Sequence, residues 1–342
     1  MTNTAPARIL KNISWYSDEK AIKKGEPGIY HSYMASLATA LHYIGVDVNP
    51  AYLMGAGAFA FRIWVHELMC PSAMSVFKWP DILPEAIEQA GFHCVYIDRM
   101  WEDGDKEQER RQQAHTEIIK RINSGTPAIA WDVAKVEWGL IIGYDNDKQL
   151  YSILACDGKS LSLPYIKLGK NGINVLSVAI PAEPNERSRE DVILNSLKAA
   201  VAHAEQQEWS ERPVYQNGLD AYELWASIFD KWALLVGAGK SKKLPSNLPQ
   251  FAVYYAGHYY SARCYARNYL NDISNGNEML KKAALSYEKV ASFLKPVWEY
   301  FSNNKKPDVE NLNYSAQNVR SAKDAEEEGI KSIKDYLAQN KC

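Results

Sequence analysis

The stretch PAIAWDVAKVEWGLIIGYDNDKQLYSILACDG, residues 127–158, has the pattern of consecutive β-strands. Its apolar runs are separated by short polar turns such as DNDK, which connect neighbouring antiparallel strands rather than parallel ones. Two further apolar runs lie before and after this stretch. The sequence therefore predicts an antiparallel sheet with strands at 93–98, 127–133, 138–145, 149–156 and 173–181.

Helical segments precede this sheet. The stretch GIYHSYMASLATALHYIG, residues 28–45, predicts a buried helix over 33–44, because apolar residues such as Met34 and Leu37 fall on one helical face. Ser32 stands at the expected N-cap of that helix. A helix N-terminus carries partial positive charge, so it favours an anionic nucleophile or an oxyanion. Helices followed by an antiparallel sheet indicate an α+β fold class.

The chain changes character at IPAEPNERSRED, residues 180–191. Strands and helices mix before this polar, proline-containing segment, and nearly everything after it has helical periodicity. We therefore predict two domains, an α+β domain over 1–183 and an all-α helical bundle over 184–342. The bundle contains four clearly amphipathic helices and a weaker fifth over 315–338.

The composition is typical of a globular protein that acts on neither nucleic acid nor membrane. The 342 residues are 46% hydrophobic and 23% charged, with a net charge of −2 and no basic patch. No apolar run approaches the ~18 residues of a membrane-spanning helix, and MTNTAPARILKN lacks the apolar region of a secretory signal. The five cysteines are scattered, without a CxxC pair. We expect a cytoplasmic protein without disulfides, metal sites or cofactors.

Three motifs resemble a known family. EWGLIIGYDND and LACDG are similar to the second and third catalytic motifs of papain-like and bacteriocin-processing peptidase folds, and LMGAGAFAF is similar to a Gly-rich stretch of the butirosin biosynthesis protein H group. The resemblance covers residues 25–180 and implies a papain-like fold. It also implies transfer of an aminoacyl group from a carrier protein to an amine. Ser32 stands in the position of the family's cysteine, Glu137 in that of its histidine, and Asp157 in that of its orienting residue.

These departures leave two interpretations for each matched residue. Ser32 is either a nucleophile or a simple helix cap, since a serine hydroxyl needs a base to take its proton. Glu137 is either a functional carboxylate, suited to an amine ligand or to acid–base work, or a solvent-facing strand residue. Its unperturbed pKa of ~4.3 makes an ordinary glutamate a weak base at neutral pH. Asp157 either orients a partner or caps the DGKS turn.

Cys70 is the alternative nucleophile. MCPSA has the pattern of a helix start, with Pro71 at the first helical position and Cys70 at the N-cap, where a thiolate would be stabilised. His66 lies four residues earlier and is the candidate base. The other interpretation of Cys70 is a small buried apolar residue. Arg62, Trp64 and His66 alternate, so in an extended segment they share one face and contact either a ligand or each other.

Two functional hypotheses follow. In the first, the chain is an acyltransferase or amide hydrolase acting on a small molecule or a carrier-bound acyl group, with Cys70 preferred over Ser32 as nucleophile. In the second, it is a non-catalytic small-molecule-binding protein that keeps the papain-like cleft. The helical bundle then closes the pocket or forms a homodimer interface. Residues near the matched positions or on the alternating segment are the candidate ligand contacts: His31, Arg62, Trp64, Asp132 and Trp138.

Overall fold

The computed structural model describes residues 6–208, 214–303 and 306–340, and the chain forms two compact units. The sheet unit comprises residues 1–18, 31–53 and 79–187, and the helical unit comprises 19–30, 54–78 and 188–342. The change from mixed to helical structure thus lies near the predicted boundary at 183. The two earlier segments of the helical unit differ from the predicted division, because their contacts are made with helices far away in the sequence.

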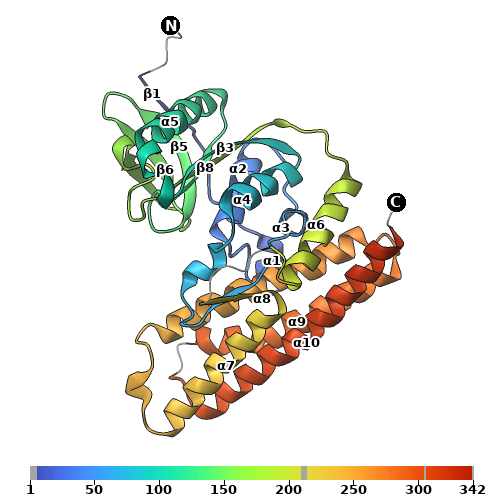
Figure 1. Cartoon of the computed structure of the whole chain (residues 1–342). Helices are drawn as coiled ribbons and strands as arrows, with labels where there is room; N and C mark the ends of the chain where they lie inside the picture. Colours follow the sequence, from blue (N-terminus) through green and yellow to red (C-terminus); the bar gives the residue numbers. More distant parts are fainter. Residues whose placement is uncertain (1–5, 209–213, 304–305, 341–342) are drawn as a thin grey trace. The chain divides into compact units, whose positions relative to one another are not determined.

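An antiparallel sheet of seven strands forms the centre of the sheet unit (Figure 1). The strand order is β3-β8-β4-β5-β6-β7, and the short β1 also pairs with β5. The antiparallel sheet and all five predicted strands are confirmed. Strands β1 and β7 were not predicted, because both are short and largely exposed. The strands are β1 (Ala7–Ile9), β3 (Phe92–Arg99), β4 (Ala128–Trp131), β5 (Trp138–Asp145), β6 (Leu150–Leu154), β7 (Ser160–Pro164) and β8 (Leu176–Pro184).

Three helices cover this sheet: α2 (Ser32–Tyr43), α4 (Trp79–Gln89) and α5 (Glu107–Ser124). Helices α2 and α4 meet the sheet at a cluster of tryptophans, in which the rings of Trp79, Trp131 and Trp138 lie 5.0–5.2 Å apart. Helix α5 buries Ala114, Ile118 and Ile122, and it also bonds to the hydroxyls of Tyr144 and Tyr151 on the sheet. Two short 3-10 segments, Trp101–Lys106 and Tyr165–Lys167, complete this unit.

Long helices dominate the helical unit (Figure 1). They are α6 (Arg189–Ala204), α7 (Gly218–Gly237), α8 (Leu248–Ile273), α9 (Glu278–Ser302) and α10 (Val309–Gln339). The predicted weak fifth helix is α10, whose 31 residues make it longer than the other four. The smaller elements are α1 (Glu19–Lys23), the strand pair β2 (Trp64–His66) and β9 (Tyr215–Asn217), and the 3-10 turns Pro71–Ser75 and Ser241–Lys243. Helix α3 (Pro50–Ala56) carries the chain from the sheet unit into the helical unit.

A buried ion pair joins four of these helices. Glu326 of α10 accepts two hydrogen bonds of 2.8 Å from Arg263 of α8, and the hydroxyls of Tyr222 of α7 and Tyr287 of α9 bond to the same carboxylate. Arg263 also donates to the carbonyls of residues 60 and 62. This explains why segment 54–78 belongs to the helical unit although it precedes most of the sheet in sequence.

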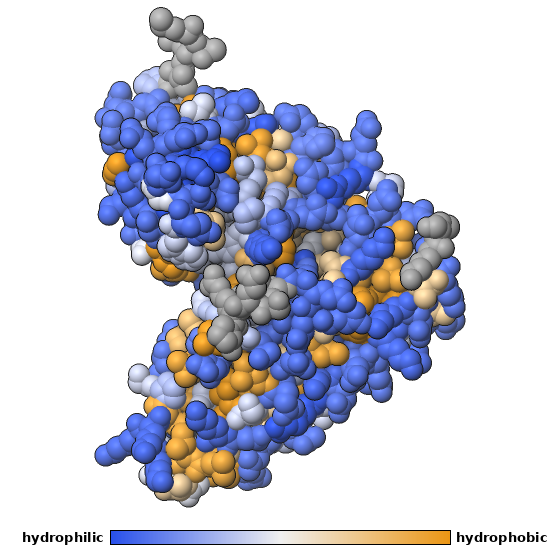
Figure 2. Space-filling view, in the orientation of Figure 1, coloured by the Kyte–Doolittle hydropathy of each residue, from blue (hydrophilic) through white to orange (hydrophobic). Residues whose placement is uncertain are grey.

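Most of the exposed surface is hydrophilic, and apolar areas appear over the bundle in Figure 2. Leu234, Leu285 and Tyr314 are the large apolar side chains exposed by more than half on α7, α9 and α10. The predicted homodimer stays a prediction. No helix among the described residues is both long and apolar enough to cross a membrane. Four cysteines are free thiols, and the fifth, Cys342, lies outside the described residues.

Candidate functional site

Ser32 and Glu137 form a direct hydrogen-bonded pair. The Ser32 hydroxyl donates to Glu137 Oε2 at 2.6 Å, and the amide of Trp138 donates to Ser32 Oγ at 3.4 Å. Both side chains are half-buried. The predicted helix cap is wrong by one residue, because His31 occupies the N-cap and Ser32 is the first residue of α2. The Ser32 side chain is therefore turned to a carboxylate 105 residues away rather than to its own helix.

Packing holds α2 in the position that this bond requires. The ring of Tyr33, the next residue of the helix, meets the ring of Trp138 at 5.0 Å and an angle of 75°. The Tyr33 hydroxyl also donates to the carbonyl of Leu83 in α4 at 2.6 Å. The first helical bond of α2 runs from Ala35 N to His31 O, so the amides of residues 32–34 precede the helical ladder and point out of the helix end. The pair thus lies at the positive end of α2.

A tight turn presents Glu137 at the start of β5. The amide of Asp132 donates to the carbonyl of Glu137 at 3.0 Å, and the amide of Glu137 donates to the carbonyl of Lys135 at 2.6 Å. Asp132 adopts a left-handed backbone with φ of 54°. The turn 132–137 and the end of α2 therefore come together at one end of the sheet.

Charged groups surround the pair on the neighbouring loop. Asp157 accepts hydrogen bonds from Lys135 at 2.8 Å and Lys159 at 3.0 Å, and these two ammonium groups lower the pKa of its carboxyl. Burial raises the pKa of the Cys156 thiol, and the negative charge of Glu137 raises it further. The predicted orienting residue Asp157 thus acts on Lys135 rather than on Glu137 directly. Lys135 and Cys156 were not predicted as site residues, since neither occupies a matched catalytic position, although Cys156 lies within LACDG.

Three predicted ligand contacts lie in this unit, and all are buried. His31 is the N-cap of α2, with 4% of its surface exposed. Trp138 is 1% exposed and belongs to the tryptophan cluster. Asp132 is 3% exposed, and its carboxylate accepts hydrogen bonds from the amides of Gly172 and Ile173. The main-chain amide of Trp138 donates to Ser32 Oγ at 3.4 Å.

The second predicted nucleophile lies in the helical unit. Cys70 is the N-cap of the 3-10 turn that begins at Pro71, as predicted. Its Sγ accepts a hydrogen bond from Ser72 at 3.0 Å. The Nδ1 of His66 accepts the amide of Leu68 at 3.0 Å, and no hydrogen bond joins His66 to Cys70 within the described structure. Burial lowers the pKa of His66.

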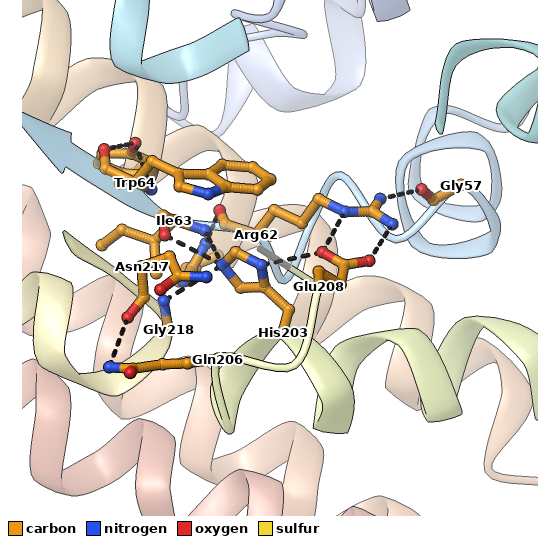
Figure 3. A network of polar contacts seen from close by, with 11 residues as sticks. Gly57, Arg62, Ile63, Trp64, His203, Gln206, Glu208, Asn217 and Gly218 are labelled. Carbon is orange, nitrogen blue, oxygen red and sulfur yellow. Dashed lines mark hydrogen bonds and ion pairs between the residues drawn. The ribbon is translucent and has the colours of Figure 1, made fainter. Parts of the chain in front are cut away.

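Arg62 and Trp64, also in the helical unit, belong to a buried network (Figure 3). Arg62 forms two hydrogen bonds to Glu208 and one to the carbonyl of Gly57. His203 Nδ1 lies 3.0 Å from the Glu208 carboxylate, and the Trp64 ring packs 4.4 Å from the His203 ring. Burial opposes the ionisation of Glu208, but Arg62 and His203 outweigh it and lower the pKa. Ion pairing and packing account for both predicted contacts.

No model of a known protein family matches this chain, and no curated protein matches it. Among the described residues, no group of three or more His, Cys, Asp or Glu side chains could hold a metal ion. The Ser32–Glu137 pair places a hydroxyl in hydrogen-bond contact with a carboxylate at the start of α2. A hydroxyl, a carboxylate within hydrogen-bond reach and a helix N-terminus are the elements of nucleophilic catalysis.

Proposed function

We propose that the sheet unit is a papain-like domain that catalyses acyl transfer or amide hydrolysis on a small amine- or acyl-bearing molecule, with Ser32 as nucleophile and Glu137 as general base. The observation that carries this proposal is the 2.6 Å hydrogen bond from the Ser32 hydroxyl to the Glu137 carboxylate. It supplies the contact between nucleophile and base that a serine requires. Cys70 loses its place as preferred nucleophile because His66 is not bonded to it.

The proposed reaction begins when Ser32 Oγ attacks the carbonyl carbon of the acyl donor and its proton passes to Glu137. The negative charge that develops on the carbonyl oxygen is stabilised by the amides at the start of α2. The bond to the leaving amine or thiol then breaks, and that group takes the proton from Glu137. An acyl-serine ester remains. Water or an acceptor amine attacks the ester, Glu137 takes the proton of the attacking group, and Ser32 recovers its proton.

The environment of the pair supports this assignment. Both side chains are half-buried, so substrate can reach them while much of the bulk water is excluded. Lys135 and Lys159 both pair with Asp157, so this group keeps one net positive charge for an anionic part of a substrate. The steps use a serine, a carboxylate and backbone amides, so they require no cofactor.

A fluorophosphonate probe tests the proposal, because it forms a covalent bond with activated serines. The full chain is incubated with the probe, and the labelled peptide is located by mass spectrometry. We expect labelling at Ser32 in the natural chain, none at that peptide in Ser32→Ala, and at least about tenfold slower labelling in Glu137→Gln, since a positioned general base contributes about 10²–10⁴-fold. Ser72→Ala is the matched control, because it removes another hydrogen-bonded serine and should leave Ser32 labelling unchanged.

Folded protein that is not labelled at Ser32 would refute the catalytic proposal and leave the non-catalytic binding hypothesis. Labelling that persists equally in Glu137→Gln would refute the role of Glu137 as base while leaving Ser32 as nucleophile. The pH dependence adds a third test. Labelling should fall in acid as Glu137 becomes protonated, because only the carboxylate can accept the serine proton.

A further inference from the structure

Asp132 connects two loops beside the Ser32–Glu137 pair. Its Oδ2 accepts hydrogen bonds from the amides of Gly172 at 2.6 Å and Ile173 at 2.7 Å. Its own carbonyl accepts the side chain of Asn171 at 3.2 Å. A buried carboxylate with two short amide donors is a strong and directional anchor. Loop 169–174 is thus bound through Asp132 to the turn that carries Glu137.

The same residue also closes the turn itself. The Asp132 amide donates to the Glu137 carbonyl at 3.0 Å, and its left-handed backbone, with φ of 54°, makes that contact possible. Such a backbone conformation is costly for a residue other than glycine and persists only where surrounding contacts enforce it. The bonds from loop 169–174 to the carboxylate and carbonyl of Asp132 provide those contacts.

A second buried charge binds both ends of the loop. Arg99 at the end of β3 is 2% exposed and donates to the carbonyls of Asn174 at 2.8 Å and Gly169 at 2.6 Å. A carboxylate therefore binds the amides of this loop, while a guanidinium binds its carbonyls. These main-chain contacts make the loop a fixed support rather than a mobile rim.

We propose that Asp132 is a positioning residue, whose carboxylate uses loop 169–174 as a support to fix Glu137 within hydrogen-bond reach of Ser32. The effect of Asp132 on catalysis rests on the proposed function, whereas its effect on the position of Glu137 does not. Displacement of a catalytic group by about 1 Å can slow a reaction by 10²-fold, so this support has a measurable effect although Asp132 touches no reacting atom.

Gly172 offers an independent way to disturb the support. A Cβ added there would lie 3.3 Å from both carboxylate oxygens of Asp132 and 3.3 Å from Val136 Cγ2, next to Glu137. The φ of Gly172 lies outside the left-handed region, so Gly172→Ala acts through these contacts rather than through backbone strain. The variant displaces Asp132 while leaving its charge intact.

The experiment compares Asp132→Ala, which removes the oxygen that accepts both loop amides, and Gly172→Ala with the control Tyr144→Phe. Tyr144 lies on β5 as Glu137 does, is buried, and donates a 2.8 Å hydrogen bond to Asn123 that the control removes. Two quantities are measured on the folded full chain: the rate of fluorophosphonate labelling at Ser32, and the titration of the Glu137 carboxyl carbon by NMR. Urea unfolding of each variant establishes that it is folded under the assay conditions.

We expect both test variants to label about 10- to 100-fold more slowly and to raise the pH at which Glu137 titrates, because the carboxylate loses a hydrogen bond that favours its charged form. Tyr144→Phe should change neither the labelling rate nor the Glu137 titration, even if its unfolding free energy falls as much as that of the test variants. Unchanged labelling and titration in both test variants would overturn the inference. If the natural chain is not labelled at Ser32 but the Glu137 titration shifts in the two test variants, the proposed function is refuted and the positioning role is supported.

Discussion

Replacing Glu326 with glutamine should lower the unfolding free energy of the helical unit by about 3–5 kcal/mol, the usual cost of breaking a fully buried ion pair from one side. The side chain of Arg263 is 0% exposed and that of Glu326 is 3% exposed, and two hydrogen bonds of 2.8 Å connect them. Glutamine keeps the shape of glutamate but leaves the guanidinium as a buried cation without a counter-charge. The hydroxyls of Tyr222 and Tyr287 also lose a charged acceptor.

The chain contains a matched control for this change. Arg320 of α10 pairs with Glu223 at 3.0 Å and with Asp230 at 2.6 Å, both on α7. These groups are 33–50% exposed, so water screens the pair. Glu223→Gln should therefore cost no more than about 1 kcal/mol. The two substitutions make the same chemical change on helices of the same bundle. They differ in burial and in the second carboxylate, Asp230, that Arg320 keeps.

Urea unfolding followed by circular dichroism at 222 nm measures both variants, since the helical signal reports chiefly on the long helices. The double variant Arg263→Met with Glu326→Leu tests the cause, because it removes both charges and should recover much of the loss. A loss in Glu326→Gln no larger than that in Glu223→Gln would refute the reasoning. So would a double variant less stable than Glu326→Gln alone.

Two further substitutions test the packing and the electrostatics of segment 54–78. Gly55→Ala should lower the unfolding free energy by about 1–3 kcal/mol, because the added Cβ would lie 2.0 Å from the ring of Tyr269. An unchanged midpoint of urea unfolding would contradict this close approach. Glu208→Gln should lower the melting temperature at pH 7. The pKa of Glu208 is lowered in the folded state, so its stabilising contribution is present above about pH 4.3 and declines as the pH falls further. The difference in melting temperature between the natural chain and Glu208→Gln should therefore shrink at pH 3. An equal difference at both pH values would contradict the role of Arg62.

The sequence predicted the sheet well where strands are buried. The runs around 138–145 and 173–181 are apolar enough to be recognised without any partner, and both are strands. The strand at 160–164 was not predicted because Leu163 is the one buried residue of its five. Its pairing with β6 is a property of the sheet rather than of its own pattern.

The candidate site was predictable only in part. The order of motifs indicated Ser32 and Glu137, and the structure brings these two together. The same motif order suggested Asp157 as their orienting partner, but two lysines bind it instead. The role of Asp132 was not visible, because its partners lie about 40 residues further along the chain.

The amino-acid sequence by itself determined the class of each long element, since helical and strand periodicities depend on which side chains must leave water. It also indicated that long helices follow residue 183, as α6 to α10 do. Only the tertiary structure decided that segments 19–30 and 54–78 join the helical unit, and that Ser32 faces Glu137 rather than capping its own helix. Those outcomes depend on hydrogen bonds and ion pairs between residues far apart in the chain. Local periodicity does not indicate which distant residues will pair.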